Sequence, residues 1–577
     1  MLRKHVILIA LLIISIGVYL YLHNKVLKAK DFEPDNSKKE TPVDLRPKII
    51  AKLQQLVKDG SYGLYKLSID SLSTNVLTSK VTITGASLDI DSSALKKLHN
   101  LQLLPDEIFR IKINSIHFDG LGIADLLQKN QLELSGINIE KPVIDVYHQA
   151  LPYNAEERTR DDSSGLFNKL SGQLKKLFIG KINIDHGILV HHNLDKNNMI
   201  TRMDNVFMQM KDLLIDSTTL AGQQRKLSIK QTTIRAENYN VLTSDHYYRV
   251  RIGSIGISSE TNQLVAKNIL LEPNGGRAAL RKKLKYRNEI FHIIIPDLEL
   301  KGVDWQDLIN GKKIKANIAI LNNGSINAFC DKSLPAITKK QNNFPHQLLM
   351  RIPIPLSVDK ILTHHFKVIY EEYNPKVKKA AMVTFNEIEG SIEHLSNIKE
   401  EIKAQPEAFF KCTGKFMNDV PMNGKIVFDL ARVTGGHFTG DLKVGALNNT
   451  LINTVSETLS LFSVKRGKMQ QGIAHVSANN KNAQGSISLY YDDLHITPLK
   501  PDSTGTRELK SSHLKSFIAN KILIKNSNPS NGKLRQPSFS VIRNPESGFF
   551  RLIWESITAG MVKSIGVPVK LVLKNAE

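Results

Sequence analysis

The sequence predicts a mainly β protein in which an elongated, curled antiparallel sheet forms an apolar trough, accompanied by short helices and an N-terminal transmembrane helix. Three observations predict this fold class. Beyond Gly60, short runs of Ile, Leu, Val and Thr alternate with polar residues, which is typical of half-buried strands. One such pattern recurs along the chain, and an uncharged run near the N-terminus is long enough to cross a membrane.

The composition is that of a globular protein with an excess of positive charge. The chain has 577 residues, with 78 Lys and Arg against 55 Asp and Glu, so the formal net charge is +23. With 41% hydrophobic residues, disorder is excluded as the overall state. The positive charge leaves open a nucleic acid, an anionic membrane surface or no specific partner.

Residues 1–30 are predicted to anchor the chain in a membrane. Residues 6–22 (VILIALLIISIGVYLYL) carry no charge, and their length is near the lower limit of roughly 17–25 residues for a spanning helix. Basic residues flank the run on both sides, as they also do in a cleaved signal peptide, which is the alternative. Because the run stays apolar where a cleavage region turns polar, an uncleaved signal anchor is favoured.

Residues 31–60 are predicted to form a linker and an amphipathic helix. The linker, residues 31–47, is polar and contains three prolines. Apolar residues then recur at the spacing of one helical face, and Gly60 stands where a C-terminal cap is expected. This helix is expected to cover one end of the sheet.

A broken alternation recurs through the β region. Two apolar residues alternate with polar ones, two positions interrupt the alternation, and two further apolar residues follow. A β-bulge or a two-residue turn at the interruption would keep all four side chains on one face. These residues are therefore candidates for the apolar lining of the trough, and the alternative is a core that fills itself. The candidates are Ile111, Ile113, Ile116, Phe118, Ile293, Ile295, Leu298 and Leu300.

The same region contains an internal duplication. Residues 65–72 match residues 248–255, residues 109–126 match residues 291–308, and residues 181–186 weakly match residues 360–365. We therefore predict two repeat units, 61–245 and 246–404. Each unit is expected to carry a short helix, at 124–128 in the first and at 305–309 in the second.

Residues 405–577 are predicted to form a distinct C-terminal β segment. Gly-rich strands surround a helical run at 447–462, and residues 548–566 form a terminal amphipathic helix. Phe550, Trp554, Ile557 and Met561 share one face of this helix. That face is expected to cap the sheet, and docking on a membrane or on a protein partner is the alternative.

The sequence contains none of the local motifs that indicate catalysis, a phosphate-binding loop or a zinc site. In strands, the adjacent residues of the pairs His191-His192 and His364-His365 would point to opposite faces, which is poor geometry for joint metal binding. No enzymatic activity and no cofactor are therefore expected. Cys330 and Cys412 form at most one disulfide, and their pairing stays open.

The densest basic cluster lies between residues 277 and 287. Arg281, Lys282, Lys283 and Lys285 within it are candidates for contact with lipid head groups. The alternative is a solvated helix face that Leu280 and Leu284 dock onto the protein. Aromatic residues make up only 6% of the chain and do not interleave with this cluster, so no nucleic-acid partner is expected.

The chain resembles the AsmA-like group of Gram-negative envelope proteins, which is related to TamB and to bridge-like lipid-transfer proteins. The resemblance rests on the uncharged run at 6–22, the repeated Ile-x-Ile-x-x-Ile pattern, and residues 447–494, which end in GSISLYYDDL. It implies a single-pass inner-membrane protein whose body lies in the periplasm and binds or transfers phospholipid along an apolar β groove in outer-membrane biogenesis. The alternative is a membrane-tethered structural or assembly factor that binds an envelope protein without lipid transport.

Overall fold

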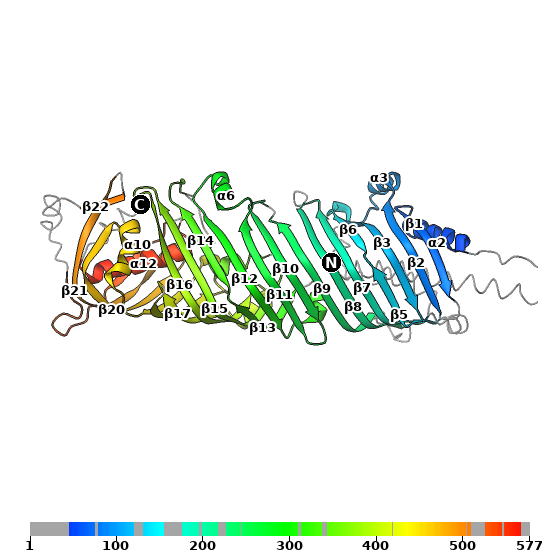
Figure 1. Cartoon of the computed structure of the whole chain (residues 1–577). Helices are drawn as coiled ribbons and strands as arrows, with labels where there is room; N and C mark the ends of the chain where they lie inside the picture. Colours follow the sequence, from blue (N-terminus) through cyan, green and yellow to red (C-terminus); the bar gives the residue numbers. More distant parts are fainter. Residues whose placement is uncertain are drawn as a thin grey trace, which may run out of the picture. The chain divides into compact units, whose positions relative to one another are not determined.

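The computed structural model describes residues 46–75, 79–120, 131–154, 176–195, 199–216, 227–243, 245–309, 313–336, 343–352, 354–417, 419–502, 505–508, 525–544 and 547–566. Of these residues, 60% lie in strands of mixed β-sheet, and the helices are few and short (Figure 1). The chain divides into two compact units, Met1–Ala266 (unit 1) and Lys267–Glu577 (unit 2). The predicted repeat boundaries at 245/246 and 404/405 stay a prediction.

The described part of unit 1 begins with a helix and continues almost entirely as strands. Its described elements are α2 (Arg46–Gly60), β1 (Tyr65–Asn75), β2 (Lys80–Ile90), α3 (Ser92–Asn100), β3 (Glu107–Asp119), β4 (Gln131–Leu134), β5 (Gly136–Glu140), β6 (Val143–His148), η1 (Pro152–Asn154), β7 (Lys176–Asn193), β8 (Met199–Asp216), β9 (Leu227–Leu242) and β10 (Tyr248–Ser258). The division between the units falls within β11 (Gln263–Pro273).

Among the described residues, unit 2 has more helices than unit 1. Its described elements are α6 (Arg277–Lys283), β12 (Glu289–Lys301), α7 (Trp305–Ile309), β13 (Ile314–Asn322), β14 (Ser325–Asp331), α8 (Pro345–Leu349), β15 (Leu356–Asn374), β16 (Lys379–Ser396), α9 (Lys399–Ala404), β17 (Glu407–Phe416), β18 (Val420–Asp429), η3 (Val433–Gly435), β19 (Phe438–Val444), α10 (Asn449–Leu459), β20 (Phe462–Ala478), β21 (Asn482–Asp502), β22 (Gly505–Glu508), β23 (Ser538–Ile542) and α12 (Phe549–Ser564).

The expectation of a purely antiparallel sheet is wrong. Most neighbouring strands are antiparallel, but β4, β5 and β6 pair in parallel with β7, and β13 and β14 pair in parallel with β15. Parallel neighbours need a crossover of a dozen or more residues, which residues 149–175 and 332–355 provide. Alternation within a strand does not reveal the direction of its neighbour, so the sequence pattern could not distinguish the two cases.

One uncommon strand arrangement occurs in both units. In unit 1, β3 pairs antiparallel with β5 and β6 in succession, and both of these pair in parallel with β7. In unit 2, β12 pairs antiparallel with β13 and β14, and both of these pair in parallel with β15. β3 and β12 contain the matching residues of the predicted duplication, as do β7 and β15.

Polar residues in a left-handed backbone conformation mark the interruptions of the alternation. The β7–β8 register shifts beside His186 (φ 51°) and Asn205 (φ 47°), and the β15–β16 register shifts beside His365 (φ 51°) and Glu387 (φ 48°). Asn, Asp and His adopt this conformation more often than most non-glycine residues. Between β2 and β3 the register is kept, and Gly85 (φ 64°) opposes Asn114.

Helices cover parts of the sheets in both units. Leu53 of α2 is 1% exposed and packs in the main apolar cluster of unit 1, so the amphipathic helix predicted before Gly60 covers a sheet as expected. The helix predicted at 305–309 is α7. The helix predicted at 124–128 and the predicted anchor at 6–22 lie outside the described residues. Among the residues described, no helix combines the length and hydrophobicity needed to cross a membrane.

Candidate functional site

An apolar cavity in unit 2 lies between α10, α12 and the sheet. α10 begins at Asn448, whose side chain accepts a hydrogen bond from the Leu451 amide at 2.9 Å, and buries Val455 and Leu459. α12 buries Leu552, Ala559 and Val562, and contacts β21 and β23. A Cβ atom at Gly560 would lie 2.7 Å from Ile487 Cγ2, so glycine permits the close approach of α12 to β21.

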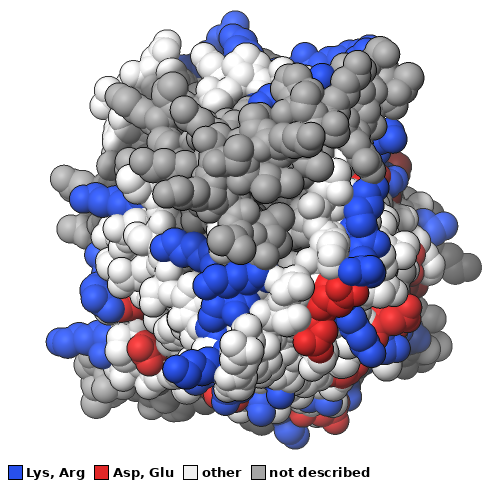
Figure 2. Space-filling model, turned by 90° about the vertical axis from the view of Figure 1, so that its left-hand side faces the viewer, with Lys and Arg blue, Asp and Glu red and all other residues white. Residues whose placement is uncertain are grey.

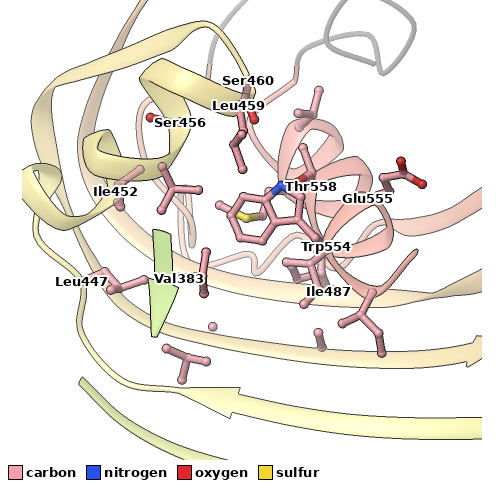
Figure 3. A pocket seen from close by; sticks show the side chains of 18 of the residues that line it. Val383, Leu447, Ile452, Ser456, Leu459, Ser460, Ile487, Trp554, Glu555 and Thr558 are labelled. Carbon is pink, nitrogen blue, oxygen red and sulfur yellow. The ribbon is translucent and has the colours of Figure 1, made fainter. Parts of the chain in front are cut away.

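The cavity has a volume of about 330 Å³ and a lining that is mostly hydrophobic. In Figure 3, α10 supplies Ile452, Ser456 and Leu459 from one side, α12 supplies Trp554, Glu555 and Thr558 from the other, and strands lie beneath them. This volume is at the lower end of the roughly 300–1,000 Å³ that is usual for small-molecule sites. Further lining residues are Val383, Phe385, Phe416, Leu442, Val444, Leu447, Met469, Ile487, Leu489 and Ile496.

The Trp554 side chain lies between the two helices. It projects from α12 toward α10 in Figure 3 and is partly buried against the cluster that contains Val383, Val455 and Leu459. The chain has only two tryptophans, and the other, Trp305, belongs to α7. Trp554 is therefore a natural fluorescent reporter of what enters the cavity.

Charged residues in the cavity wall are paired with each other. Lys332 Nζ lies 2.5 Å from Glu372, to which the Tyr370 hydroxyl donates a hydrogen bond of 2.7 Å. Arg551 Nε donates to Glu555 at 2.8 Å. Burial by itself would raise the pKa of Glu372, but Lys332 and Arg551 hold it below its usual value, so Glu372 stays ionised. These two pairs add no net charge to the wall.

The predicted groove-lining residues lie apart from this cavity. Ile111, Ile113, Ile116 and Phe118 of β3 are between 0% and 5% exposed and pack in the apolar cluster of unit 1. In β12, Leu300 is buried and Ile293, Ile295 and Leu298 are half-buried. The β3 residues are thus part of a packed core in unit 1, and a lipid-lining role for the two sets stays a prediction.

The sequence analysis missed most residues of the cavity. Leu451, Ile452, Val455 and Leu459 recur at helical spacing, which indicates an apolar face on α10 but not what it faces. The lining otherwise comes from many strands, each of which contributes one or two ordinary apolar residues. No local signal distinguishes a residue that lines a cavity from one that fills a core.

The predicted docking face of the terminal helix forms part of the cavity wall. Phe550, Trp554, Ile557 and Met561 all line the cavity, and Phe550 is 40% exposed. The most buried face of α12 is a different one, formed by Leu552, Ser556 and Ala559. Contact of the predicted face with a protein partner stays a prediction.

The basic cluster of unit 2 is partly occupied by internal contacts. Arg281 forms an ion pair with the buried Asp331, and Leu280 is 1% exposed, so α6 is docked on the sheet. Lys282, Lys283 and Lys285 are exposed and form no ion pair with the described residues. These three lysines are free to meet a head group, and that contact stays a prediction.

Basic and acidic side chains share the molecular surface. On the face shown in Figure 2, lysine and arginine side chains lie at several separate places, and acidic side chains lie among them on part of the same face. The described residues of this face therefore do not form one continuous basic surface of the kind that follows a nucleic-acid backbone.

The described cysteines and histidines do not gather into a metal-binding cluster. Cys330 and Cys412 are free thiols, and β15 and β16 lie between their strands, β14 and β17. His364 and His365 both contact Glu389, at 2.8 and 3.5 Å, so the expectation that they point to opposite faces is wrong, because the left-handed His365 breaks the alternation. Within the described ranges, no cluster of three His, Cys, Asp or Glu residues could hold a metal ion.

A comparison with models of known protein families and with curated proteins finds no match for this chain.

Proposed function

We propose that this protein is a membrane-anchored, AsmA-like lipid-binding protein, and that the unit 2 cavity holds the acyl part of a phospholipid. The observation that carries the proposal is the cavity between α10 and α12, whose wall is hydrophobic apart from internally paired charges. The sequence supports the rest of the proposal: an anchor at residues 6–22 in the inner membrane, the body in the periplasm, and a curled sheet that offers an apolar trough to lipid in outer-membrane biogenesis.

The volume of the cavity suits one acyl chain. A methylene group is similar in size to a water molecule, which occupies about 30 Å³ in the liquid. A cavity of about 330 Å³ therefore takes roughly eleven methylene groups. The head group of the phospholipid would stay outside the cavity.

The same estimate shows why such a site suits transfer between membranes. Burying each methylene from water stabilises the complex by about 0.8 kcal/mol, or roughly 9 kcal/mol for eleven groups. A chain that leaves a bilayer is already surrounded by hydrocarbon, so this term nearly cancels. The cavity would protect the chain from water and still release it to another membrane. This transfer of lipid needs no chemical conversion, cofactor or nucleic acid.

Trp554 provides the direct test. In the full chain carrying Trp305→Phe, Trp554 is the only tryptophan, and vesicles that contain phospholipid brominated on its acyl chains should quench its emission. The Trp554→Phe chain, which keeps Trp305, is the matched control and should not be quenched. Equal quenching in both chains, or none in either, would refute acyl-chain binding in this cavity.

A second pair of variants tests the position of the lipid. Ile452→Arg places a charge at the cavity wall, and a bound acyl chain would exclude water from that charge at a large cost in free energy. This variant should therefore abolish the quenching of Trp554. Thr454→Arg makes a similar change on the exposed side of the same helix and should leave quenching intact.

A further inference from the structure

Three exposed apolar side chains lie on the turns that follow α2 and α3 in unit 1. Tyr62 is 74% exposed, Leu101 56% and Leu103 63%. Tyr62 follows α2 and the two leucines follow α3. Apolar tips on neighbouring turns, surrounded by polar residues, are a feature of surfaces that bind a partner or a membrane.

The packing beneath these side chains ties the turn after α2 to α3. Asp91, which caps α3, donates its backbone N–H to the carbonyl of Leu64 at 2.8 Å. Leu64 packs in one cluster with Leu98 and Leu104. A Cβ atom at Gly63 would lie 3.9 Å from the Cβ of Ala94.

The backbone also directs the tips away from the core. Tyr62 has φ 51° and Gln102, between the two leucines, has φ 58°. Left-handed conformations are uncommon for residues such as tyrosine. Each is held by a turn: the Gly63 N–H donates to Lys58 at 2.7 Å, and the Leu103 N–H donates to Leu98 at 2.9 Å. The buried Leu64 and Leu104 flank the exposed positions, so the exposure is built into both turns.

Three exposed lysines lie on the helices that precede these side chains, Lys58 on α2 and Lys96 and Lys97 on α3. Lys58, Lys96 and Lys97 are exposed and form no ion pair with the part of the chain that the structure describes. Two carboxylates nearby are already engaged: Asp91 caps α3 and pairs with Lys66 at 2.6 Å, and Asp59 accepts a hydrogen bond from the Gln55 side chain at 2.7 Å. Apolar tips within a basic rim match the head-group region of an anionic bilayer.

We propose that the surface formed by Tyr62, Leu101 and Leu103 with Lys58, Lys96 and Lys97 docks on an anionic lipid bilayer. The position of the predicted anchor supports this occupant. Leu22 ends the uncharged run and precedes Arg46 by 24 residues, which span at most roughly 80 Å in any conformation. Docking of a second copy of the chain would bring like-charged lysines together. A nucleic acid would offer no apolar environment in which Tyr62, Leu101 and Leu103 could be buried. This inference rests on the proposed anchor and concerns a different surface from the cavity.

The test reports on the surface in the full chain. In a Cys330→Ser, Cys412→Ser background, Leu103→Cys carries an environment-sensitive dye, and the protein is reconstituted into vesicles with or without phosphatidylglycerol. Emission should shift to the blue in the anionic vesicles. The shift should weaken as salt rises from about 0.1 to 1 M, because the Debye length falls from about 10 to about 3 Å. A dye at Ile200→Cys, a 52% exposed position on β8, should not shift.

Three results would overturn the proposal. The first is an unshifted dye at position 103 on a chain that still floats with the vesicles, which leaves the anchor intact. The second is a shift that Lys58→Glu, Lys96→Glu and Lys97→Glu together do not reduce. The third is a shift that follows the density of protein instead of lipid charge, which indicates a second copy. Failure of the chain to float refutes the anchor instead.

Discussion

At the scale of single residues, burial controls the chemistry of the reactive groups. Cys330 is 4% exposed and Cys412 is half-buried, and burial raises their pKa values to about 12 and about 11. Two strands separate β14 from β17, which places them roughly 14 Å apart at about 4.8 Å per strand, whereas a disulfide needs Cα atoms within about 7 Å. The thiols are therefore separate and weakly ionised.

Both thiols should react slowly with alkylating agents in the folded chain. At pH 8 the raised pKa values reduce the thiolate fraction about 100- to 1,000-fold relative to an unperturbed cysteine. Mass spectrometry after timed iodoacetamide treatment measures both rates, and the chain unfolded in urea gives the reference. Equal rates in the folded and unfolded chains would contradict the burial of the thiols.

His346 should make unit 2 less stable in mild acid. It is 3% exposed between Phe344 and Phe428, and burial lowers its pKa to about 4, while Asp429 opposes this effect and His437 adds to it. Between pH 6.5 and 4, His346 is protonated in the unfolded chain but stays neutral in the folded chain. The free energy of unfolding should therefore fall by about 3 kcal/mol between pH 6.5 and 4, and change little above 6.5.

Urea titrations across this pH range test the effect of His346. His346→Gln should flatten the pH dependence, whereas His99→Gln, which removes an exposed histidine of unit 1, should not. An unchanged slope in His346→Gln would show that other groups cause the loss of stability.

At the scale of elements, the contact between α12 and β21 forms the cavity. Gly560 lies against Ile487 and Phe539, and its lack of a side chain lets the helix pack closely enough for Trp554 and Met561 to reach the cavity wall. The packing of α12 thus shapes the cavity of unit 2.

Gly560→Ala should destabilise unit 2 although alanine favours helix. The added methyl group would lie 2.7 Å from Ile487 Cγ2 and 2.9 Å from Phe539 Cδ1, so buried side chains must move. Overpacking costs about 1–3 kcal/mol, which exceeds the gain of about 1 kcal/mol from helix propensity. A lower midpoint of urea unfolding, with altered Trp554 emission, is the expected result.

Gly440→Ala is the matched control for this change. Its added methyl group would meet its nearest atoms at 3.7 Å, which is ordinary contact, so its midpoint should shift much less. If both variants shifted equally, a general effect of replacing glycine would explain the result.

At the scale of the whole molecule, the net charge of +23 and the uncharged run at 6–22 belong to one proposal. Many cations are used internally: Arg281 pairs with Asp331, Lys332 with Glu372 and Arg551 with Glu555. The exposed lysines that remain, among them Lys96 and Lys97, suit a protein held beside anionic head groups.

Deletion of residues 2–30 should release the chain from membranes. Without the uncharged run, only surface contacts remain, and these are reversible and weakened by salt. Fractionation after a high-salt wash should find the shortened chain in the soluble fraction, while deletion of residues 31–45 leaves it in the membrane fraction. A shortened chain that resists the wash would contradict the proposed anchor.

Much of the fold follows from local chemistry and could be read from the residues. Period-two alternation indicated the strands, and the spacing of Ile50, Leu53 and Val57 indicated α2. The matching residues 109–119 and 291–301 fall on two strands with equivalent neighbours. These features depend on contacts within a strand or helix, so nearby residues carry the signal.

Only the tertiary structure decided strand direction, cavity and surface. Ile113 and Ile487 both sit in alternating strands, yet one packs in the core of unit 1 and the other lines the cavity of unit 2. That difference depends on the packing of α12, which is distant in sequence, against β21, and on how closely Gly560 lets the helix approach the strand. Burial is a property of the whole packing, and an alternating pattern records only that a side chain faces inward.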